Sequence, residues 1–205
     1  CTYSNMRRLS MLMVFSLNLN LLLNYSVVQT QYSQRTTDSS NCVAPWYIPV
    51  YTIAMKLSKL VKALKKENIS YMIVGGYAVN FHGYSRNTVD IDLIIKFTLA
   101  NLKKIEKLLQ KMGMVSTLPI DAVSVFKFRE EYIKNRNLIA WNFYSENDPT
   151  DQIDILINHD VSDFKSEKFR VGQLELKVIS KEDLIKMKKK AGREKDLLDI
   201  KELTK

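Results

Sequence analysis

Two aspartates are separated by one residue in an otherwise apolar run of the sequence, TVDIDLII. The run predicts a buried strand, on which side chains two positions apart point to the same side. Asp90 and Asp92 are therefore expected to project together. Val89, Ile91 and Leu93 are expected to point the opposite way, into the core. Two carboxylates this close resist ionisation unless a cation neutralises them. Mg²⁺ (or Mn²⁺) is the expected cation, because it prefers carboxylate oxygens and binds substrate phosphates at the same time.

A third acid occupies the centre of another apolar run, QIDILIN. Asp154 alternates there with isoleucines that are expected to face inward. If the two strands are neighbours in a sheet, three carboxylates meet at one place. Such a cluster suits two-metal phosphoryl transfer, in which acids hold the ions and one acid accepts a proton from the attacking hydroxyl.

Two glycines, Gly75 and Gly76, follow the apolar run YMIV and precede YAVNFHG, which is compatible with a short helix ending at Gly83. A strand that opens into a helix through glycine presents backbone N–H groups at the helix start, where a phosphate can bind. Taken alone, a Gly-Gly pair more often marks a turn. Its place shortly before the Asp-x-Asp run favours a phosphate site.

The elements that must position these groups follow from hydrophobic periodicity. Apolar residues recur at helical spacing in MKLSKLVKALKKENIS, with a stop near Asn68, and again from Leu99 to Met112, with a stop at Gly113. Strands are expected in YMIV, TVDIDLII, AVSVFKF, LIAWNFYS and QIDILIN, with a polar stretch, REEYIKNRN, after the third of them. FRVGQLELKVIS predicts a hairpin that turns near Gly172.

The C-terminal part of the sequence predicts two helices. Ser180 is expected to cap the first, with Asp183 completing a box-like pattern, and this helix runs to about Ala191. Gly192 interrupts, and EKDLLDIKEL forms the second helix. The order of helices and strands predicts an α/β or α+β domain with a mixed sheet flanked by helices.

The segment GGYAVNFHGYSRNTVDID resembles the active-site signature of the DNA polymerase β-like nucleotidyltransferase superfamily. Its variant is similar to that of the small bacterial AbiEii/AbiGii toxin-like nucleotidyltransferases, whose tail resembles VISKEDLIKMKKKAGREKDLLDIKEL. The resemblance covers residues 55–203 and implies the nucleotidyltransferase fold. The commoner form of the signature has serine where this chain has Gly76, so one hydroxyl contact to phosphate is absent.

The resemblance implies roles for individual residues. Gly75 and Gly76 would hold the nucleotide triphosphate, and Asp90, Asp92 and Asp154 would hold the metal ions, with Asp154 as ligand or general base. Arg86 and Thr88 match the subfamily's R-x-T, and Lys188 matches the tail lysine; all three would bind the nucleotide phosphates. Arg193 and Asp196 also match the tail, but their i, i+3 spacing equally allows them to pair with each other.

Composition changes near Met55. Residues 1–54 contain both cysteines and only four charged side chains, whereas the rest of the 205-residue chain is lysine-rich and carries most of the net charge of +9. We therefore expect an N-terminal extension, residues 1–54, and a nucleotidyltransferase domain, residues 55–205.

The extension has three interpretations. The run MRRLSMLMVFSLNLNLLL begins basic and continues apolar, as a signal peptide does, but asparagines interrupt it and no small-residue cleavage site follows. It is also short and polar for a transmembrane helix. The favoured interpretation is disordered or upstream sequence before a natural start at Met55; a signal or anchor and a structured extension are the others. The body lacks cysteine and is expected in the cytoplasm, without stable membrane association.

The leading functional hypothesis is Mg-dependent transfer of a nucleoside monophosphate from an NTP to a hydroxyl of tRNA, protein or a small molecule. Relatives by the resemblance act on tRNA as toxins, on antibiotics or on proteins. As a toxin, the protein would have a cognate antitoxin, and a partner chain could complete its site. The alternative is an inactive nucleotide-binding or regulatory module, favoured if Asp154 lies more than about 8 Å from the other two acids. The basic charge leaves a third class open, an RNA-binding subunit.

Overall fold

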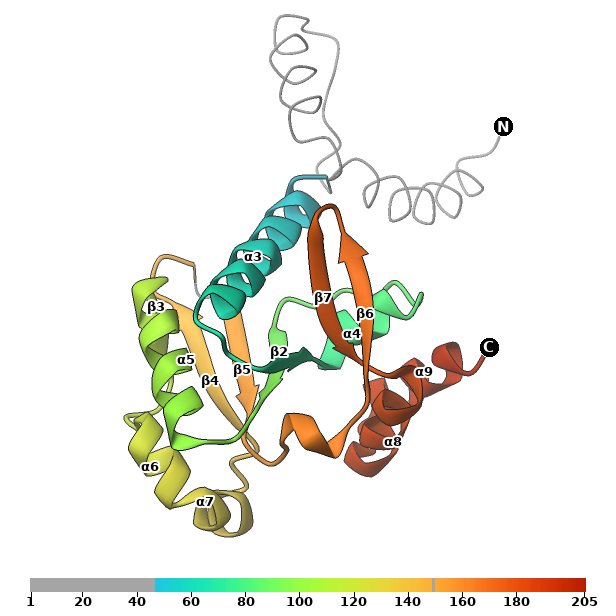
Figure 1. Cartoon of the computed structure of the whole chain (residues 1–205). Coiled ribbons are helices and arrows are strands. Elements are labelled where there is room, and N and C mark those ends of the chain that lie inside the picture. Colours follow the sequence, from blue (N-terminus) through green and yellow to red (C-terminus); the bar gives the residue numbers. More distant parts are fainter. Residues whose placement is uncertain (1–46, 149) are drawn as a thin grey trace, which may run out of the picture. The chain divides into compact units, whose positions relative to one another are not determined.

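The computed structural model describes residues 47–148 and 150–205, with side chains from Lys56 onward (Figure 1). The chain divides into two compact units, residues 1–55 with 170–176 and residues 56–169 with 177–205. All residues of the predicted site belong to the second unit. The interpretations of residues 1–46 lie outside the described residues, so the expected boundary near Met55 stays a prediction.

One mixed sheet organises the domain and confirms the predicted α/β class. Its strands follow the order β3-β4-β5-β2-β1-β7-β6. β2 pairs with β5 in parallel and with β1 in antiparallel orientation. The strands are β1 (Tyr71–Ile73), β2 (Ile91–Ile95), β3 (Met114–Ser116), β4 (Ala140–Ser145), β5 (Gln152–Leu156), β6 (Ser166–Val171) and β7 (Leu174–Ile179).

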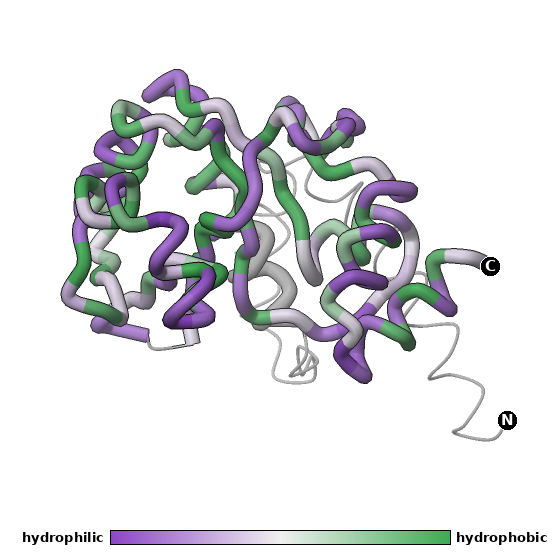
Figure 2. The backbone as a smooth tube through the Cα atoms, turned by 90° about the horizontal axis from the view of Figure 1, so that it is seen from below, coloured by the Kyte–Doolittle hydropathy of each residue, from purple (hydrophilic) through white to green (hydrophobic). Residues whose placement is uncertain are grey.

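Seven α-helices accompany the sheet in the described part of the chain. They are α3 (Tyr47–Lys66), α4 (Gly75–Phe81), α5 (Leu99–Lys111), α6 (Ala122–Lys127), α7 (Arg129–Arg136), α8 (Lys181–Ala191) and α9 (Glu194–Leu203), with a 3₁₀ turn at Val161–Asp163. In Figure 2 the helices alternate between hydrophobic and hydrophilic residues along the tube. That pattern is expected of helices that bury one side and expose the other. Among the described residues, no helix combines the length and the apolar character that a bilayer span requires.

The helices and strands around the predicted site form where the sequence indicates. α3 ends just before Asn68, whose backbone is left-handed, and α5 ends just before Gly113, as expected. Thr98 caps α5 by accepting a hydrogen bond from the Asn101 N–H, while Ser180 caps α8 by accepting one from the Asp183 N–H. The hairpin around Gly172 is also present, as β6 and β7.

Two expected strands differ from the structure. AVSVFKF is not a strand but helix α6, because Asp121 caps it and because its buried residues, Ala122 and Val125, are three apart. The polar stretch that follows is α7, and the short strand β3 was not expected at all. β2 begins only at Ile91, so Val89 does not point into the core: it is 58% exposed.

The centre of the sheet is the apolar core. β2 contributes Leu93, Ile94 and Ile95, all with essentially no exposed surface, and β5 contributes Ile153 and Ile155. Burial on this scale stabilises each large side chain by roughly 1.5–3 kcal/mol. The core therefore fixes the backbone of β2 and β5, and with it the positions of the acids that these strands carry.

Candidate active site

Three carboxylates converge where β2 and β5 run side by side. Asp92 and Asp154 are register partners on these parallel strands, and Asp90 directly precedes β2. One ligand oxygen from each of the three acids lies within 4.8 Å of the others. The acids thus meet as expected from the two separate sequence runs, well within the 8 Å that would have favoured an inactive module. This donor set of carboxylate oxygens fits a hard cation such as Mg²⁺ or Mn²⁺.

The electrostatics of Asp92 and Asp154 would favour a cation beside them. Burial, followed by the charges of Asp90 and Asp154, raises the pKa of Asp92 to about 7, although a Gly76 N–H and the charge of Lys188 oppose the shift. Burial also raises the pKa of Asp154, against a hydrogen bond from the Asn142 side chain. Without a cation, the ionised form of these groups is disfavoured; a bound cation reverses that preference.

The two glycines allow close approach at the start of α4. Gly75 has φ +62°, and a Cβ there would overlap Oδ2 of Asp92. A Cβ on Gly76 would overlap Oγ1 of Thr88 and would lie 2.7 Å from Nη2 of Arg86. The backbone N–H of Gly76 donates to the Asp92 carboxylate. The glycines are therefore needed for packing against the acids, and their contact with a triphosphate stays a prediction.

Thr88 and Arg86 lie beside the acids and glycines. The Thr88 hydroxyl donates a hydrogen bond to Oδ1 of Asp90 over 2.8 Å. This bond orients the Asp90 carboxylate directly before the start of β2. The Arg86 backbone N–H donates to the Asn80 side chain over 2.9 Å, and its Nε lies 3.2 Å from Oδ1 of Asp199. Both residues are thus near the site, as the resemblance implies, while their contact with phosphate stays a prediction.

Lys188 is buried between two carboxylates. Its side chain is only 4% exposed, and Nζ donates to Oδ1 of Asp196 over 3.1 Å and to Oδ2 of Asp199 over 2.6 Å. Arg193 Nε lies 2.7 Å from a carboxylate oxygen of Asp196. These two residues of the tail motif therefore pair with each other, as their spacing allows. Much of the donor capacity of the Lys188 ammonium group is therefore already engaged. The contact of Lys188 with a triphosphate stays a prediction.

Sequence reasoning did not single out Asp199 and Asn142. Asp199 shares the buried side of α9 with Asp196 and Leu203, and this 3–4 residue spacing was a readable signal: an acid on the apolar face of a helix. Asn142 faces Asp154 as its register partner on β4. No local pattern marks that pairing, because it depends on which strands become neighbours.

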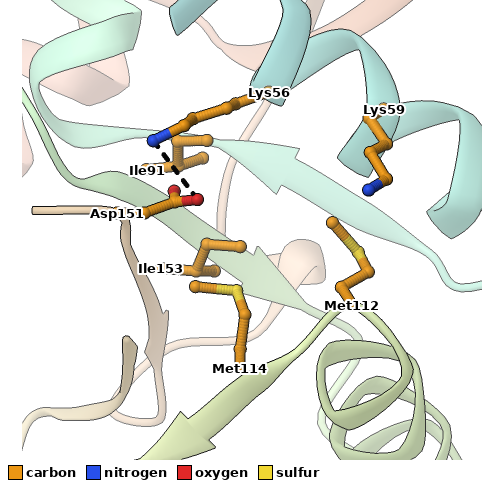
Figure 3. A pocket seen from close by; sticks show the side chains of 7 residues that line it. All are labelled: Lys56, Lys59, Ile91, Met112, Met114, Asp151 and Ile153. Atoms are coloured by element: carbon orange, nitrogen blue, oxygen red, sulfur yellow. Dashed lines mark ion pairs between the residues drawn. The ribbon is translucent and has the colours of Figure 1, made fainter. Parts of the chain in front are cut away.

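The opposite face of the same strands carries a pocket of about 210 Å³ (Figure 3). Ile91 and Ile153 form its floor, and they alternate with the site acids along β2 and β5. Lys56 crosses it to pair with Asp151 at 3.3 Å. Its remaining walls are Lys59 of α3 together with Met112 and Met114. Because side chains alternate on a strand, this pocket lies behind the acids and is not part of their site.

Comparisons with solved structures show the same fold. The solution structure of the antibiotic-resistance factor ANT(2'')-Ia has a TM-score of 0.51 at 12% identity, over 75% of this chain and 83% of that chain. The lincomycin-bound crystal structure of the lincosamide antibiotic adenylyltransferase LnuA has a TM-score of 0.51 at 16% identity, over 73% and 95%. The crystal structure of ANT(2'')-Ia with adenylyl-2''-tobramycin has a TM-score of 0.50 at 13% identity, over 74% and 87%. No curated protein sequence matches this chain.

The chain also matches a family of sequences. The model of the aminoglycoside-2''-adenylyltransferase family matches residues 56–203, which include every residue of the predicted site. The predicted nucleotidyltransferase superfamily is confirmed, whereas membership of the AbiEii/AbiGii toxin-like group stays a prediction. By this match, the chain belongs to the aminoglycoside-2''-adenylyltransferase family and is a nucleotidyltransferase.

Proposed function

We propose that the protein transfers a nucleoside monophosphate, AMP in the first instance, from an NTP to a hydroxyl acceptor and releases pyrophosphate. One observation carries the proposal: one carboxylate oxygen from each of Asp90, Asp92 and Asp154 lies within 4.8 Å of the others. Such a set of acids has a high electrostatic cost unless it serves a cation, and phosphoryl transfer is the chemistry that oxygen-bound divalent cations support.

The residues divide the work as follows. Asp90 and Asp92 hold Mg²⁺ (or Mn²⁺), which when bound neutralises charge on the transferring phosphate. Asp154 accepts the proton of the acceptor hydroxyl, whose oxygen forms a bond to the α-phosphorus. The bond from that phosphorus to the bridging oxygen breaks, and pyrophosphate leaves with the electron pair. A raised pKa suits Asp154 to this step, because a base works best when its pKa approaches the working pH.

Binding of the donor falls to the residues around the start of α4. Gly75 and Gly76 let the triphosphate approach the backbone closely, and Thr88 keeps Asp90 oriented. Arg86 supplies a guanidinium beside Gly76, suited to phosphate oxygens by its fork of donors. Lys188 is buried, and its positive charge lowers the pKa of Asp92 and so favours the ionised carboxylate.

For the acceptor we propose a hydroxyl-bearing small molecule. The matched family is named for aminoglycosides, and two of the solved structures that share the fold hold lincomycin and adenylyl-2''-tobramycin. A second acceptor, tRNA, is favoured by the chain's net charge of +9, which attracts polyanions and disfavours a polycationic aminoglycoside. The tRNA hypothesis includes the toxin role, a cognate antitoxin and a cytoplasmic site of action.

Transfer of label from [α-³²P]ATP to a panel of acceptors tests this function. The panel contains tobramycin, lincomycin and bulk tRNA, with Mg²⁺ or Mn²⁺ present. We expect labelled product with at least one acceptor and none from Asp92→Asn. Binding of MgATP without transfer to any acceptor, including whole-cell RNA and protein extracts, would instead favour the nucleotide-binding module.

A further inference from the structure

We propose that Asp199 is the positioning residue of the nucleotide site: it holds the Arg86 guanidinium beside Gly76, and Lys188 is the counter-ion that fixes Asp199. The inference rests on the proposed function, since it assumes that a nucleotide binds at the start of α4. It assigns the acids and the buried lysine of α8 and α9 a role behind the phosphate-binding residues instead of among them.

The burial of Asp199 is the first observation. This side chain at the middle of α9 is about 1–2% exposed, and a carboxylate removed from water needs charged partners. Its two oxygens serve different residues. Oδ2 accepts from Nζ of Lys188 over 2.6 Å, while Oδ1 faces Nε of Arg86 at 3.2 Å. Asp199 therefore joins a buried lysine of α8 to an arginine that comes from the loop before β2.

Arg86 is the end of this chain of contacts that reaches the nucleotide site. Its backbone N–H is held by Asn80 of α4, and its Nη1 donates to the Asn87 carbonyl over 3.3 Å. Nη2 lies beside Gly76, where a Cβ would come within 2.7 Å. Nε is buried and forms an ion pair with Asp199 without the alignment of a hydrogen bond. Asp199 thus attracts the guanidinium by charge and leaves Nη2 directed at the first turn of α4.

Lys188 is poorly placed to take the phosphate contact itself. Asp196 and Asp199 enclose its ammonium group, and Asp196 is in turn neutralised by Arg193. The cluster holds three cations, including Arg86, against two anions, so it presents one surplus positive charge next to the site acids. If Asp199 loses its charge, Lys188 keeps a partner in Asp196, but the guanidinium of Arg86 loses the only ion pair described for it.

A merely structural role would be to bind α8 to α9. Asp196 provides the matched control, because it lies on the same helix, contacts the same lysine and is as deeply buried, but does not pair with Arg86. If Asp199 acts through Arg86, its effect on nucleotide affinity must vanish once Arg86 is gone. If it only joins helices, its effect must persist in that background.

The experiment measures the Kd of MgATP calorimetrically, and the KM for ATP and kcat in the transfer assay, for the unmodified protein and for Asp199→Asn, Arg86→Gln, their double variant and Asp196→Asn. We expect Asp199→Asn and Arg86→Gln each to weaken MgATP binding about tenfold and to raise KM more than they lower kcat. The double variant should bind no more weakly than Arg86→Gln. Asp196→Asn should lower the Tm but change Kd less than about twofold.

Three results would overturn the inference: unchanged MgATP affinity in Asp199→Asn, additive losses in the double variant, or an equal loss in Asp196→Asn. If Asp199→Asn does not fold, the same comparison is made between Lys188→Met and Lys188→Met/Asp199→Asn. The Lys188→Met substitution is included because it leaves no unpaired lysine charge in the cluster. Failure of the unmodified protein to bind MgATP is a different outcome, because it removes the proposed function and this inference together.

Discussion

Asp92 and Asp154 are register partners on two parallel strands, β2 and β5, and both side chains emerge on the same face of the sheet. Asp90 joins them one step before β2. Two of the three acids thus lie on strands at the centre of the sheet, and the third lies directly before one of them. The three acids have nearly fixed separations, which suits the binding of a small cation.

The raised pKa of Asp92 predicts a stability that depends on pH in the metal-free protein. Its carboxyl ionises near pH 7 in the folded state and near pH 4 when unfolded. A group whose pKa is higher when folded favours folding at low pH, and this contribution is lost as pH rises through the folded value. The free energy of unfolding should therefore fall between about pH 4 and pH 7, by ~1.4 kcal/mol for each tenfold difference in proton affinity.

Urea unfolding in EDTA, at intervals from pH 5 to pH 8, measures this dependence. Asp92→Asn should flatten the fall and should be more stable than the unmodified protein at pH 7.5. A fall that is equally steep in Asp92→Asn would assign the dependence to other groups.

Divalent cations should stabilise the protein in a pH-dependent way. Mg²⁺ or Mn²⁺ competes with protons for Asp92, so added metal should raise the Tm more at pH 7.5 than at pH 5.5. The same titration on Asp90→Asn should show a smaller rise, because one ligand oxygen is lost. Thermal scans with KCl at matched ionic strength separate specific binding from a general salt effect. Equal rises at both pH values would contradict a site built on Asp92.

Gly75 should tolerate no side chain. Alanine there would be strained by φ +62° and would also displace Asp92 Oδ2. Gly192 is the matched control, since its φ is +64° but its nearest neighbour to a Cβ, the Lys189 carbonyl, is 3.9 Å away. We expect Gly75→Ala to lose at least about 100-fold in transfer rate, and Gly192→Ala to lose about 1 kcal/mol of stability with its activity retained. Equal activity of both variants would show that the close approach to Asp92 does not matter.

The acceptor preference should follow charge. The chain has a net charge of +9, which attracts polyanions. We therefore expect the rate of transfer to a polyanionic acceptor to fall as the salt concentration rises. The rate of transfer to a neutral hydroxyl compound should change little. Transfer rates measured between about 50 and about 300 mM KCl, over which the Debye length falls from about 14 to about 6 Å, distinguish the two kinds of acceptor. A polycationic aminoglycoside that is the best acceptor at all salt concentrations would contradict this expectation.

Local patterns were sufficient to predict the parts of the site that depend on short segments. The shared side of Asp90 and Asp92 was expected from strand alternation, and the two acids do lie together although β2 begins only at Ile91. The glycines at the start of α4 follow from the break between an apolar run and a helix. Asp154 was identified as an isolated acid in an apolar strand, but its approach to Asp92 required β2 and β5 to be neighbours. Sequence periodicity gives no strand order, so that step remained conditional until the sheet was known.

The failures have the same origin. AVSVFKF contains alternating apolar residues, but the Asp121 cap and the packing of Ala122 and Val125 make it a helix. The burial of Lys188 could not be predicted from its lysine-rich run either, because it depends on α9 bringing Asp196 and Asp199 to it. In each case tertiary contacts outweigh the local pattern, and only the assembled fold reveals them.

The most direct test of the central claim is the transfer of α-phosphate label from ATP by the unmodified protein, Asp92→Asn and Asp154→Asn, all assayed as folded proteins with Mg²⁺ or Mn²⁺. We expect label to appear in an acceptor, with equimolar pyrophosphate, only with the unmodified protein, and both variants to lose about 1,000-fold or more. Undiminished transfer by either variant, or pyrophosphate release that does not depend on these acids, would contradict the assignment of Asp90, Asp92 and Asp154 as the catalytic centre.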